Sequence, residues 1–459
     1  MSREIVVVPY HDPGHIFPCT ELCNQLAARN YHVALLIPKN SSSVPHHHHP
    51  LVRTFLHSSP RPRPPPLQQP TIDPLIDYLS HASDGRDSSS IICVIVDDMM
   101  HQVIETCLKR NIPAVTIFTS SACSAALDHA TWKVQMEGSL VPGEERTVPG
   151  LPDDVTITLS DMTHVHRPPS PPPGIEGLPP PPPSLMRPPR IAGTDGSAAM
   201  LFNTCDDLER PFIEYLANEK RKPVWAVGPL LPGRLWDSLD QPVQDAEIRP
   251  GRESNVGERE VLEWLDSKPR GSVIYVSFGS LRSPSEASLA ELAAGLEEST
   301  RPFVWVIQPK GRPGPGPVGY YPDGLAGRAG DRGLIISGWA PQLLILSHPS
   351  TGGFISHCGW NSTVEALRFG VPILAWPIDG DQFHNAKLVT ARLRCGFMIR
   401  AEPDAVTKDD VTRGIERLLG DEEARRRADS VRAVFADGFP KSSSASLDAF
   451  LESVIRNSA

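Results

Sequence analysis

The stretch "HPSTGGFISHCGWNSTVEALRFGVPILAWPIDGDQ" (residues 348–382) contains a strand, a turn and a helix in the order typical of an α/β fold. The apolar, glycine-led "GGFIS" predicts a buried strand. The following "NSTVEALRFG" predicts a helix with Asn361 or Ser362 as its N-cap and Gly370 past its end. Residues 357–360 then form a turn at the carboxyl edge of a parallel sheet, which is where open α/β sheets bind ligands.

The polar side chains of this turn suit a nucleotide diphosphate. A helix N-terminus offers free N–H groups and a partial positive charge, so it favours phosphate. Asn361, Ser362 and His357 add side-chain donors, and Glu365 lies on the same helical face, where a carboxylate fits the hydroxyls of a ribose. The alternative is that the turn is core, but four polar side chains are costly when they are buried unpaired.

Strands and helices alternate along the whole chain. The first half has the strand patterns "EIVVVPY", "HVALLIP", "IICVIVDD" and "PAVTIF", separated by amphipathic helices. The second half repeats the plan with "SVIYVSFGS", "PFVWVIQ", "GLIISGW", "GGFIS" and "VPILAWP". Runs of Val and Ile between helices predict doubly wound parallel sheets, and hence two Rossmann-like domains.

The composition shifts place the domain boundaries. We predict an N-terminal domain over residues 1–238, which includes a proline-rich segment at 166–190. A polar stretch without periodicity at 239–257 predicts a linker. We assign residues 258–440 to the C-terminal domain and expect a helix at 441–459 to pack back on the N-terminal domain.

Length and charge exclude several classes of protein. A chain of 459 residues, 40% hydrophobic and 21% charged, is typical of a globular protein with two cores. The net charge is −10 and no basic stripe stands out, so we expect no nucleic-acid partner. We expect neither a signal peptide nor a membrane span, and therefore a cytoplasmic protein. The eight cysteines include no CxxC pair and are interpreted as small core residues.

Three biased segments are interpreted as surface loops. Residues 166–190 are largely prolines and predict polyproline II; the alternative is a ligand for an SH3 or WW domain. The four histidines at 46–49 lie in a Ser/Pro-rich stretch, and the alternative there is a metal site. Residues 311–319 contain glycines but open no helix, so they do not predict a phosphate loop.

The stretch "WAPQLLILSHPSTGGFISHCGWNSTVEALRFGVPILAWPIDGDQ" (residues 339–382) resembles the complete signature box of plant secondary-metabolite UDP-glycosyltransferases. Similar segments run through the chain, among them "GHIFPCTELC", "FTSSA", "LFNTCDDLE" and "VLEWLDSKP". The resemblance implies glycosyltransferase family 1 and the GT-B fold, in which two Rossmann-like domains face a central cleft.

The resemblance also implies a UDP-glucose site in the second half of the chain. Its expected donor-binding residues run from the nucleotide to the sugar. They are Trp339 and Gln342 beside the uracil, Glu365 at the ribose, His357, Asn361, Ser362 and Ser280 at the diphosphate, and Trp360, Asp381, Gln382 and Thr119 at the sugar.

The "DGD" of residues 379–381 imitates a metal-binding motif of the other large glycosyltransferase fold. Because it lies inside the signature box, we interpret it as sugar recognition. We therefore expect no metal and no cofactor beyond the donor substrate, with the helix dipole and side-chain donors neutralising the diphosphate.

His15 is the candidate catalytic base. It lies in the loop expected after the first strand, and the pKa of histidine is near neutrality. The resemblance implies that it deprotonates the acceptor and that the reaction inverts the anomeric carbon. In the family an Asp orients this base, eight residues after the Asp that ends the preceding strand. The eighth residue after Asp97 is Glu105, which we expect to be the partner. The alternatives are Asp12, Asp98, or a base that acts with little help on an acidic phenol.

The acceptor site is less defined by the sequence. The candidates near the base and after strand ends are Tyr10, Phe17, Met99, Phe118 and Trp376, and the alternative for each is the core. The proline-rich segment lies where the acceptor loops of the family vary.

The leading hypothesis is a monomeric, metal-independent glucosyltransferase that uses UDP-glucose and forms β-glucosides of small phenols, most of all flavonoids. One alternative is a C-glucosyltransferase that uses the same base on phloroglucinol-type rings. A second is a nucleotide-sugar-binding protein with weak catalysis, and a third is a sugar-nucleotide epimerase.

Overall fold

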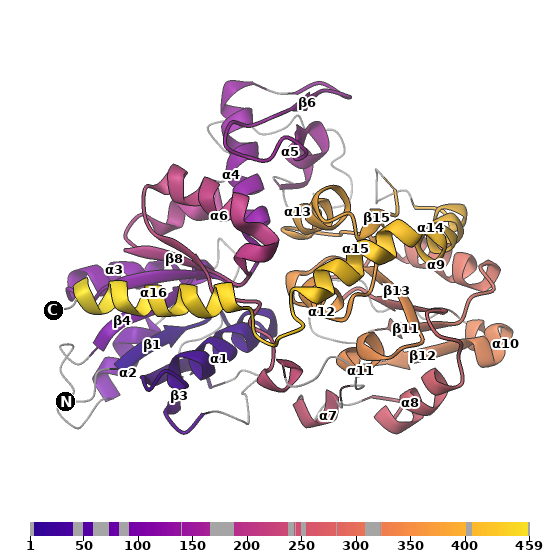
Figure 1. The fold of residues 1–459 in the computed structure, drawn as a ribbon, viewed down its shortest axis with the longest axis horizontal. Helices are drawn as coiled ribbons and strands as arrows, with labels where there is room; N and C mark the ends of the chain where they lie inside the picture. Colours follow the sequence, from indigo (N-terminus) through magenta and orange to yellow (C-terminus); the bar gives the residue numbers. More distant parts are fainter. Residues whose placement is uncertain are drawn as a thin grey trace, which may run out of the picture. The chain divides into compact units, whose positions relative to one another are not determined.

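The computed structural model describes residues 4–39, 49–57, 73–81, 91–138, 140–165, 188–236, 243, 245–248, 254–280, 282–307, 322, 324–400 and 406–457. The chain divides into two compact units. Unit 1 comprises Met1–Pro152, Pro168–Gly233 and Phe439–Ala459, and unit 2 comprises Asp153–Arg167 and Arg234–Gly438. Each unit has a parallel sheet with helices, as expected for Rossmann-like domains (Figure 1).

The boundaries at 233/234 and 438/439 differ from the predicted ones by a few residues, and two whole segments are assigned differently. The segment Asp153–Arg167 belongs to unit 2, although the sequence assigns it to the first domain. The polar stretch predicted as a linker also belongs to unit 2, and it contains a helical turn, α7 (Asp245–Ile248). Short helices do not show an apolar period in the sequence. The domain boundaries were therefore predicted from composition, which assigned both segments wrongly.

The sheet of unit 1 has seven parallel strands in the order β3-β2-β1-β4-β5-β8-β9. Alternate residues of β1 point to opposite faces, with Ile5 and Val7 in one hydrophobic cluster and Val6 and Val8 in another. Helices α1 and α16 cover the first face, and α2 and α3 cover the second (Figure 1). Both faces are buried, which explains why the strands are continuous apolar runs.

The elements of unit 1 have the following bounds. The strands are β1 (Glu4–Val8), β2 (His32–Pro38), β3 (Val52–His57), β4 (Ile91–Asp97), β5 (Ala114–Phe118), β6 (Glu145–Arg146), β8 (Ala199–Phe202) and β9 (Val224–Ala226). The helices are α1 (Pro13–Ala27), α2 (Pro74–His81), α3 (Gln102–Lys109), α4 (Ala122–Glu137), α6 (Asp206–Lys220) and α16 (Lys441–Asn457). The short 3-10 turns are η2 (Asp98–Met100) and η4 (Arg190–Thr194), with η5 (Gly233–Trp236) at the boundary.

The sheet of unit 2 has six parallel strands in the order β12-β11-β10-β13-β14-β15. The strands are β10 (Val273–Ser277), β11 (Phe303–Ile307), β12 (Gly333–Ser337), β13 (Thr351–Ser356), β14 (Ile373–Ala375) and β15 (Gly396–Met398), with the short β7 (Ile157–Thr158) apart from the sheet. The helices are α5 (Leu159–Val165), α7, α8 (Glu258–Asp266), α9 (Glu286–Glu298), α10 (Leu325–Ala329), α11 (Gln342–Ser347), α12 (Trp360–Phe369), α13 (Gln382–Lys387), α14 (Lys408–Gly420) and α15 (Glu422–Ala433). The 3-10 turn η6 (Gly330–Arg332) and the π-helical turn η7 (Leu388–Arg392) complete the unit.

Each sheet has a topological switch point between its first strand and the strand that begins its second half. In unit 1 the chain leaves β1 toward β2 and leaves β4 toward β5, on the other side. In unit 2 it leaves β10 toward β11 and β13 toward β14. The loops after such a pair of strands diverge and leave room for a ligand, so both switch points are candidate sites.

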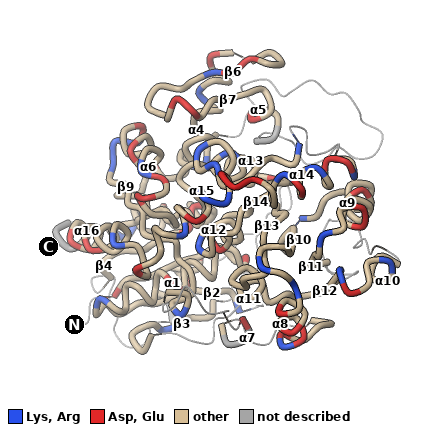
Figure 2. The backbone as a smooth tube through the Cα atoms, turned by 45° about the vertical axis from the view of Figure 1, so that its right-hand side comes forward, with Lys and Arg blue, Asp and Glu red and all other residues tan. Residues whose placement is uncertain are grey.

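Other sequence interpretations can be compared with the structure. All eight cysteines are free and buried, which confirms them as small core residues. Residues 46–48, 166–187 and 311–319 lie outside the described residues, so the loop interpretations stay predictions. Acidic and basic residues share the exposed helices α8 and α15 (Figure 2). Within the described part of the chain, no helix is long and apolar enough to cross a bilayer.

One buried carboxyl group joins two helices of unit 1. Glu209 is completely buried in a non-helical kink of α6, and its carboxyl oxygens accept hydrogen bonds from the N–H groups of Cys123 (2.7 Å) and Ala122 (3.2 Å) at the start of α4. Burial raises the pKa of Glu209 to about 7, although these hydrogen bonds oppose the shift. The protonated carboxyl is therefore the form that the folded protein prefers.

We expect the Glu209→Gln variant to lose less stability than wild type as the pH rises. A folded-state pKa above the unfolded value stabilises the fold fully below the unfolded pKa of 4.5, and this contribution is lost as the pH rises through about 7. The loss is at most about 3 kcal/mol. Urea unfolding of both proteins between pH 5 and pH 8 would measure it, and parallel pH profiles would contradict the expectation.

Candidate active site

His15 lies in the first turn of α1 and not in a loop. Asp12 is the N-cap of this helix, Pro13 is its first residue, and the backbone N–H of His15 donates to the Asp12 carbonyl at 2.9 Å. Proline is well tolerated at the first position of a helix because that N–H needs no partner there. The helix expected after the first strand therefore begins at Pro13, and its start fixes the direction of the imidazole.

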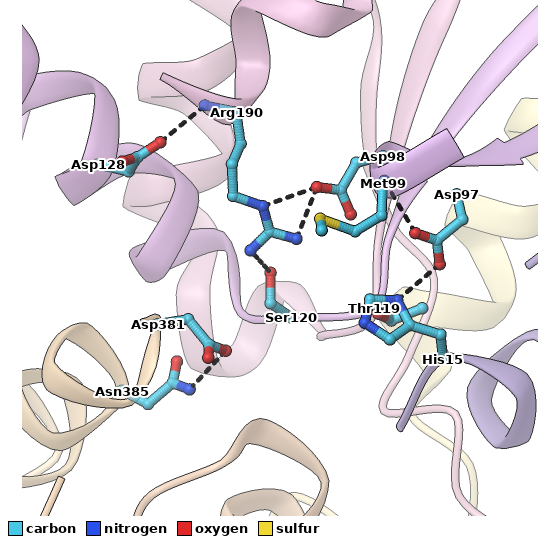
Figure 3. A network of polar contacts seen from close by, with 10 residues as sticks. All are labelled: His15, Asp97, Asp98, Met99, Thr119, Ser120, Asp128, Arg190, Asp381 and Asn385. Carbon is cyan, nitrogen blue, oxygen red and sulfur yellow. Dashed lines mark hydrogen bonds and ion pairs between the residues drawn. The ribbon is translucent and has the colours of Figure 1, made fainter. Parts of the chain in front are cut away.

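Asp97, the last residue of β4, holds the His15 ring. Its Oδ2 lies 2.8 Å from Nδ1 of His15, and its side chain is completely buried (Figure 3). The contact follows from the sheet, because β1 and β4 are neighbours and pair up to Val8 and Val96. A carboxylate accepts a hydrogen bond from Nδ1–H, so Nε2 keeps its lone pair and can act as a base.

The surroundings of His15 favour its charged form. Burial lowers the pKa of His15, but the charge of Asp97 and its hydrogen bond more than offset this effect, so the pKa lies above its ordinary value. The imidazolium that forms when the base takes a proton is therefore stabilised by the carboxylate that orients the ring.

The predicted partner of His15, Glu105, is wrong. Its side chain is 76% exposed and pairs with Lys109 on the outer face of α3 at 3.7 Å. The buried face of α3 carries Val103, Ile104 and Cys107, so a residue at position 105 points toward solvent.

The other candidates for this role are also occupied elsewhere. Asp12 lies 3.4 Å from Nε2 of His11, and Asp98 pairs with Arg190. The hypothesis of an unassisted base is wrong as well, because Asp97 contacts the ring. The sequence held the signal that was missed: an Asp that ends a buried strand next to the first strand.

Thr119 also contacts the base. Its Oγ1 lies 2.9 Å from Nδ1 of His15, and its carbonyl accepts a hydrogen bond from Asn203. Thr119 follows β5, the next strand along the sheet, so three neighbouring strand ends contribute to this site. Its expected contact with the sugar stays a prediction.

The acceptor candidates divide into two groups. Tyr10 contacts the His15 ring edge-on at 5.2 Å between centroids, and burial raises its pKa. Met99 is 36% exposed, and its N–H donates to Oδ1 of Asp97 at 3.0 Å. Phe17 is partly buried in the first turns of α1. These three stay candidates for lining an acceptor site.

Phe118 and Trp376 are wrong as acceptor residues, because both are core. Phe118 ends β5 and stacks on Phe202 of the neighbouring β8 at 4.5 Å between centroids. Trp376 follows β14, is 2% exposed and packs edge-on against Phe278. A position at the end of a strand did not distinguish side chains that point into the helix layer from those that point into a site.

In unit 2, Gln342 gathers several of the expected donor-binding residues. Its amide nitrogen donates to Oε2 of Glu365 at 2.6 Å and to Oγ of Ser362 at 3.1 Å. Its amide oxygen accepts from the hydroxyl of Tyr275 at 3.0 Å. Glu365 is 1% exposed and lies on the first turns of α12, as the spacing predicted. The network fixes the carboxylate before any ligand arrives.

His357 lies at the switch point of the same sheet, packed on two glycines. A Cβ atom would lie 2.7 Å from its Nε2 at Gly279 and 2.5 Å from it at Gly359, so only glycine fits at either position. Burial lowers the pKa of His357 to about 4, with Asp381 and a backbone hydrogen bond of Ser277 opposing. A neutral imidazole at this place is suited to donating or accepting one hydrogen bond.

The start of α12 differs from the prediction. The N-cap is Gly359, without a side-chain cap, and the helix begins at Trp360 instead of following Asn361 or Ser362. Gly370 ends the helix with a φ of 70°, as predicted. The side chains of Asn361 and Ser362 are partly buried, whereas that of Trp360 is 4% exposed, so its indole is mostly core.

The other expected donor residues lie at the carboxyl edge of the sheet of unit 2. Trp339 follows β12, and its Nε1 donates to Oδ2 of Asp245 at 3.1 Å. Asp245 lies in α7, inside the stretch predicted as a linker, and no sequence signal pointed to it. Ser280 is exposed in the turn after β10, beyond Gly279 with its φ of 71°.

Asp381 and Gln382 open α13. Oδ2 of Asp381 accepts from Nδ2 of Asn385 at 3.1 Å (Figure 3). The side-chain oxygen of Gln382 accepts from the N–H groups of Ile378 (2.8 Å) and Asp379 (3.0 Å), so its NH₂ group is the part that remains for a ligand. Asp379 pairs with Arg282 at 3.3 Å, which separates the two carboxylates of "DGD" into different contacts.

A segment from the first half of the chain supports α13. Nζ of Lys387, the last residue of α13, lies 2.5 Å from Oδ2 of Asp161 in α5 and donates to the carbonyl of Thr156 at 2.7 Å. A second ion pair joins Arg392 and Asp154 at 3.1 Å. The pair of Lys387 and Asp161 is largely buried, so it fixes the helix that begins with Gln382.

Comparison with known proteins identifies the family. Residues 249–437 match the model of the family described as "UDP-glucoronosyl and UDP-glucosyl transferase". Scopoletin glucosyltransferase of Nicotiana tabacum is 31% identical over 340 residues, which cover 72% of this chain and 67% of that protein. The chain belongs to the UDP-glycosyltransferase family. UDP-glycosyltransferase 73E1 of Stevia rebaudiana is 32% identical over 373 residues, 78% of this glycosyltransferase and 69% of the relative.

A solved structure agrees in fold. UGT2 of Phytolacca americana, complexed with UDP-2-fluoro-glucose and pterostilbene, is 25% identical, with a TM-score of 0.70 over 98% of this glycosyltransferase and 99% of that chain. The GT-B fold expected from the sequence is confirmed, and the chain is an enzyme that transfers a glycosyl group from a UDP-sugar.

We expect Glu365→Ala to weaken the binding of UDP by about 10- to 100-fold, because two hydrogen bonds to a charged group contribute roughly 1.5–3 kcal/mol. Titration calorimetry with UDP and with 2′,3′-dideoxy-UDP would test the role. The dideoxy compound lacks both ribose hydroxyls, so its affinity should change little. An equal loss for both compounds would mean that Glu365 acts through Gln342 instead. Glu263→Ala, on the exposed face of α8, is the matched control.

Proposed function

We propose that this glycosyltransferase uses UDP-glucose, inverts the anomeric carbon and forms β-glucosides of small phenolic plant metabolites, with O-glucosylation of flavonoids as the leading case. The observation that carries the proposal is the contact between Nδ1 of His15 and the buried carboxylate of Asp97 at 2.8 Å. A base with this partner is what deprotonation of an acceptor hydroxyl requires.

The reaction follows from the residues of the two sites. Nε2 of His15 takes the proton of the acceptor hydroxyl, and the imidazolium is stabilised by Asp97. The acceptor oxygen attacks the anomeric carbon from the face opposite UDP and forms the new C–O bond. The bond from that carbon to UDP breaks, and its electron pair leaves with UDP. The start of α12 and its donors stabilise the charge that develops on the diphosphate.

The donor assignment rests on the geometry of unit 2. The Gln342, Ser362 and Glu365 network presents a fixed carboxylate to a ribose, and the neutral His357 presents an imidazole to a phosphate. The NH₂ group of Gln382 suits a sugar hydroxyl. We further propose a metal-independent transfer, in which the N-terminus of α12 and its side-chain donors neutralise the diphosphate.

The preference for a phenol does not depend on a base that acts with little help, because Asp97 contacts His15. It rests on chemistry and on relatives. A phenol has a pKa near 10, so a histidine removes its proton more easily than that of an alcohol. The tobacco relative is named for scopoletin, and the Phytolacca structure contains pterostilbene, and both compounds are phenols.

The same base would serve C-glucosylation, in which a ring carbon of a deprotonated phloroglucinol attacks instead of oxygen. The two outcomes differ in the acid stability of the product. The contact between Asp97 and His15 favours catalysis over the alternative of a nucleotide-sugar-binding protein with weak catalysis. We further propose a cytoplasmic monomer.

We expect His15→Ala and Asp97→Asn each to lower the rate of UDP release from UDP-glucose and a phenolic acceptor by about 10²- to 10⁴-fold. Flavonols, flavones, dihydrochalcones, simple phenols and a terpenoid alcohol would form the acceptor panel. Mass spectrometry before and after acid hydrolysis would identify the product, and an acid-resistant glucoside would mean C-glucosylation.

Glu105→Ala is the matched control for Asp97→Asn. Its carboxylate is exposed and should change the rate by no more than about twofold. UDP release that survives Asp97→Asn, or that is lost in Glu105→Ala, would contradict the assignment of the dyad. No UDP release with any acceptor would contradict the transferase proposal.

A further inference from the structure

Two adjacent carboxylates lie at the end of β4, and only one of them contacts the base. The side chains of Asp97 and Asp98 are 0% and 1% exposed. Like charges so close together in a buried place disfavour each other, and a second anion near a histidine raises the proton affinity of that histidine. A cation that neutralises one of these two carboxylates therefore lowers the proton affinity of His15.

Arg190 neutralises Asp98. Its Nε and Nη2 lie 2.7 Å and 2.6 Å from Oδ2 of Asp98, and its Nη1 lies 3.4 Å from Oγ of Ser120 (Figure 3). Among the described residues, the other oxygen of Asp98 is buried without a hydrogen-bond partner. Arg190 is thus the cation that balances the charge of Asp98.

The guanidinium is held in a fixed place. The backbone N–H of Arg190 donates to Oδ2 of Asp128 in α4 at 2.8 Å, which anchors the start of η4 (Figure 3). The guanidinium carbon lies 5.7 Å from the ring centroid of Phe118. Ile191, the next residue, is 1% exposed and fixes the turn in the core. Because these contacts hold the guanidinium, its distance from His15 is constant, whereas the distance of an exposed, flexible arginine would vary.

We propose that Arg190 is a positioning residue for the catalytic base: by pairing with Asp98 it cancels the second carboxylate beside His15, so that Asp97 alone orients the base and sets its proton affinity. The inference rests on the proposed function, in which His15 is the base.

The other groups around His15 do not change the charge balance between Asp97, Asp98 and Arg190. Tyr10 contacts the ring from the loop after β1, and burial raises its pKa, so it stays neutral. His11 and Asp12 lie 3.4 Å apart and contact each other. Cys19, one turn further along α1, is buried and its thiol pKa is raised. Thr119 carries no charge, so the pair of Asp98 and Arg190 is what remains beside Asp97.

The effects of the two members on His15 have opposite signs. Beyond burial and Asp97, the charge of Asp98 raises the pKa of His15 and the charge of Arg190 lowers it. Removing one member should therefore move the pKa of the base in one direction, and removing the other should move it in the opposite direction. A purely structural pair would lower activity without moving the pH dependence in opposite senses.

The experiment compares kcat/KM across pH for wild type, Asp98→Asn, Arg190→Gln and the double variant. We expect the acid limb of Asp98→Asn to shift to lower pH and that of Arg190→Gln to higher pH, each by about 0.5–1 pH unit. The double variant should return close to wild type. Arg190→Lys keeps the charge and should keep the position of the limb.

A second readout does not depend on turnover. The rate at which diethyl pyrocarbonate modifies His15, followed by peptide mass spectrometry across pH, reports its pKa even in an inactive variant. Arg29→Gln, which breaks an arginine–aspartate pair with Asp448 elsewhere in unit 1, should shift neither profile.

The outcomes separate the two proposals. If both single variants leave the pKa of His15 unchanged, or shift it in the same direction, the role of Arg190 is overturned while the dyad stands. If His15→Ala keeps the wild-type acid limb, His15 is not the base, and the proposed function fails together with the inference.

Discussion

The pairing of β1 with β4 is the constraint on which the catalytic site depends. These two strands meet at the switch point of the sheet of unit 1, so the helix after β1 and the residue that ends β4 are brought to one edge. His15 and Asp97 lie far apart in the sequence and meet only because of this pairing. The hydrophobic clusters on both faces of the sheet fix the pairing, so packing of the core determines the distance between base and carboxylate.

Because this site is buried, the position of each charged group has a large effect on its free energy. Water would screen the carboxylates of Asp97 and Asp98 at a surface, whereas here each needs a partner of its own. His15 pairs with Asp97, and Arg190 pairs with Asp98. His15 lies in the first turn of α1, and Arg190 lies in the short turn η4. Arg190 is the last residue of the proline-rich segment 166–190, so a segment interpreted from its composition as a surface loop ends in a residue with a fixed contact.

The sequence predicted the fold well because buried parallel strands are long apolar runs. β1, β4, β5 and the central strands of unit 2 all fall within predicted strands. Among the strands of the two sheets it missed β8, β9 and β15, which are three or four residues long and too short to show a period. It also missed β3, whose six residues are mostly not buried and form no continuous apolar run. Most of the expected donor residues come from one continuous stretch, residues 339–382, so the sequence alone could group them, although Ser280 and Thr119 lie outside it. The partner of His15 was not predicted, because counting residues along α3 ignores which face of that helix is buried: Glu105 points outward, and Asp97 already lies beside the base.

The two switch points show how one fold supports two kinds of histidine. His15 faces a carboxylate, and its pKa is raised, so it can take a proton and remain stable as the imidazolium. His357 is packed on Gly279 and Gly359, and burial lowers its pKa to about 4, so it stays neutral near pH 7. A base must change its charge during the reaction, whereas a ligand of a diphosphate must keep a fixed hydrogen-bonding pattern. The surroundings of each ring, a carboxylate in one unit and buried packing against glycines in the other, therefore set the direction in which the pKa of the histidine moves.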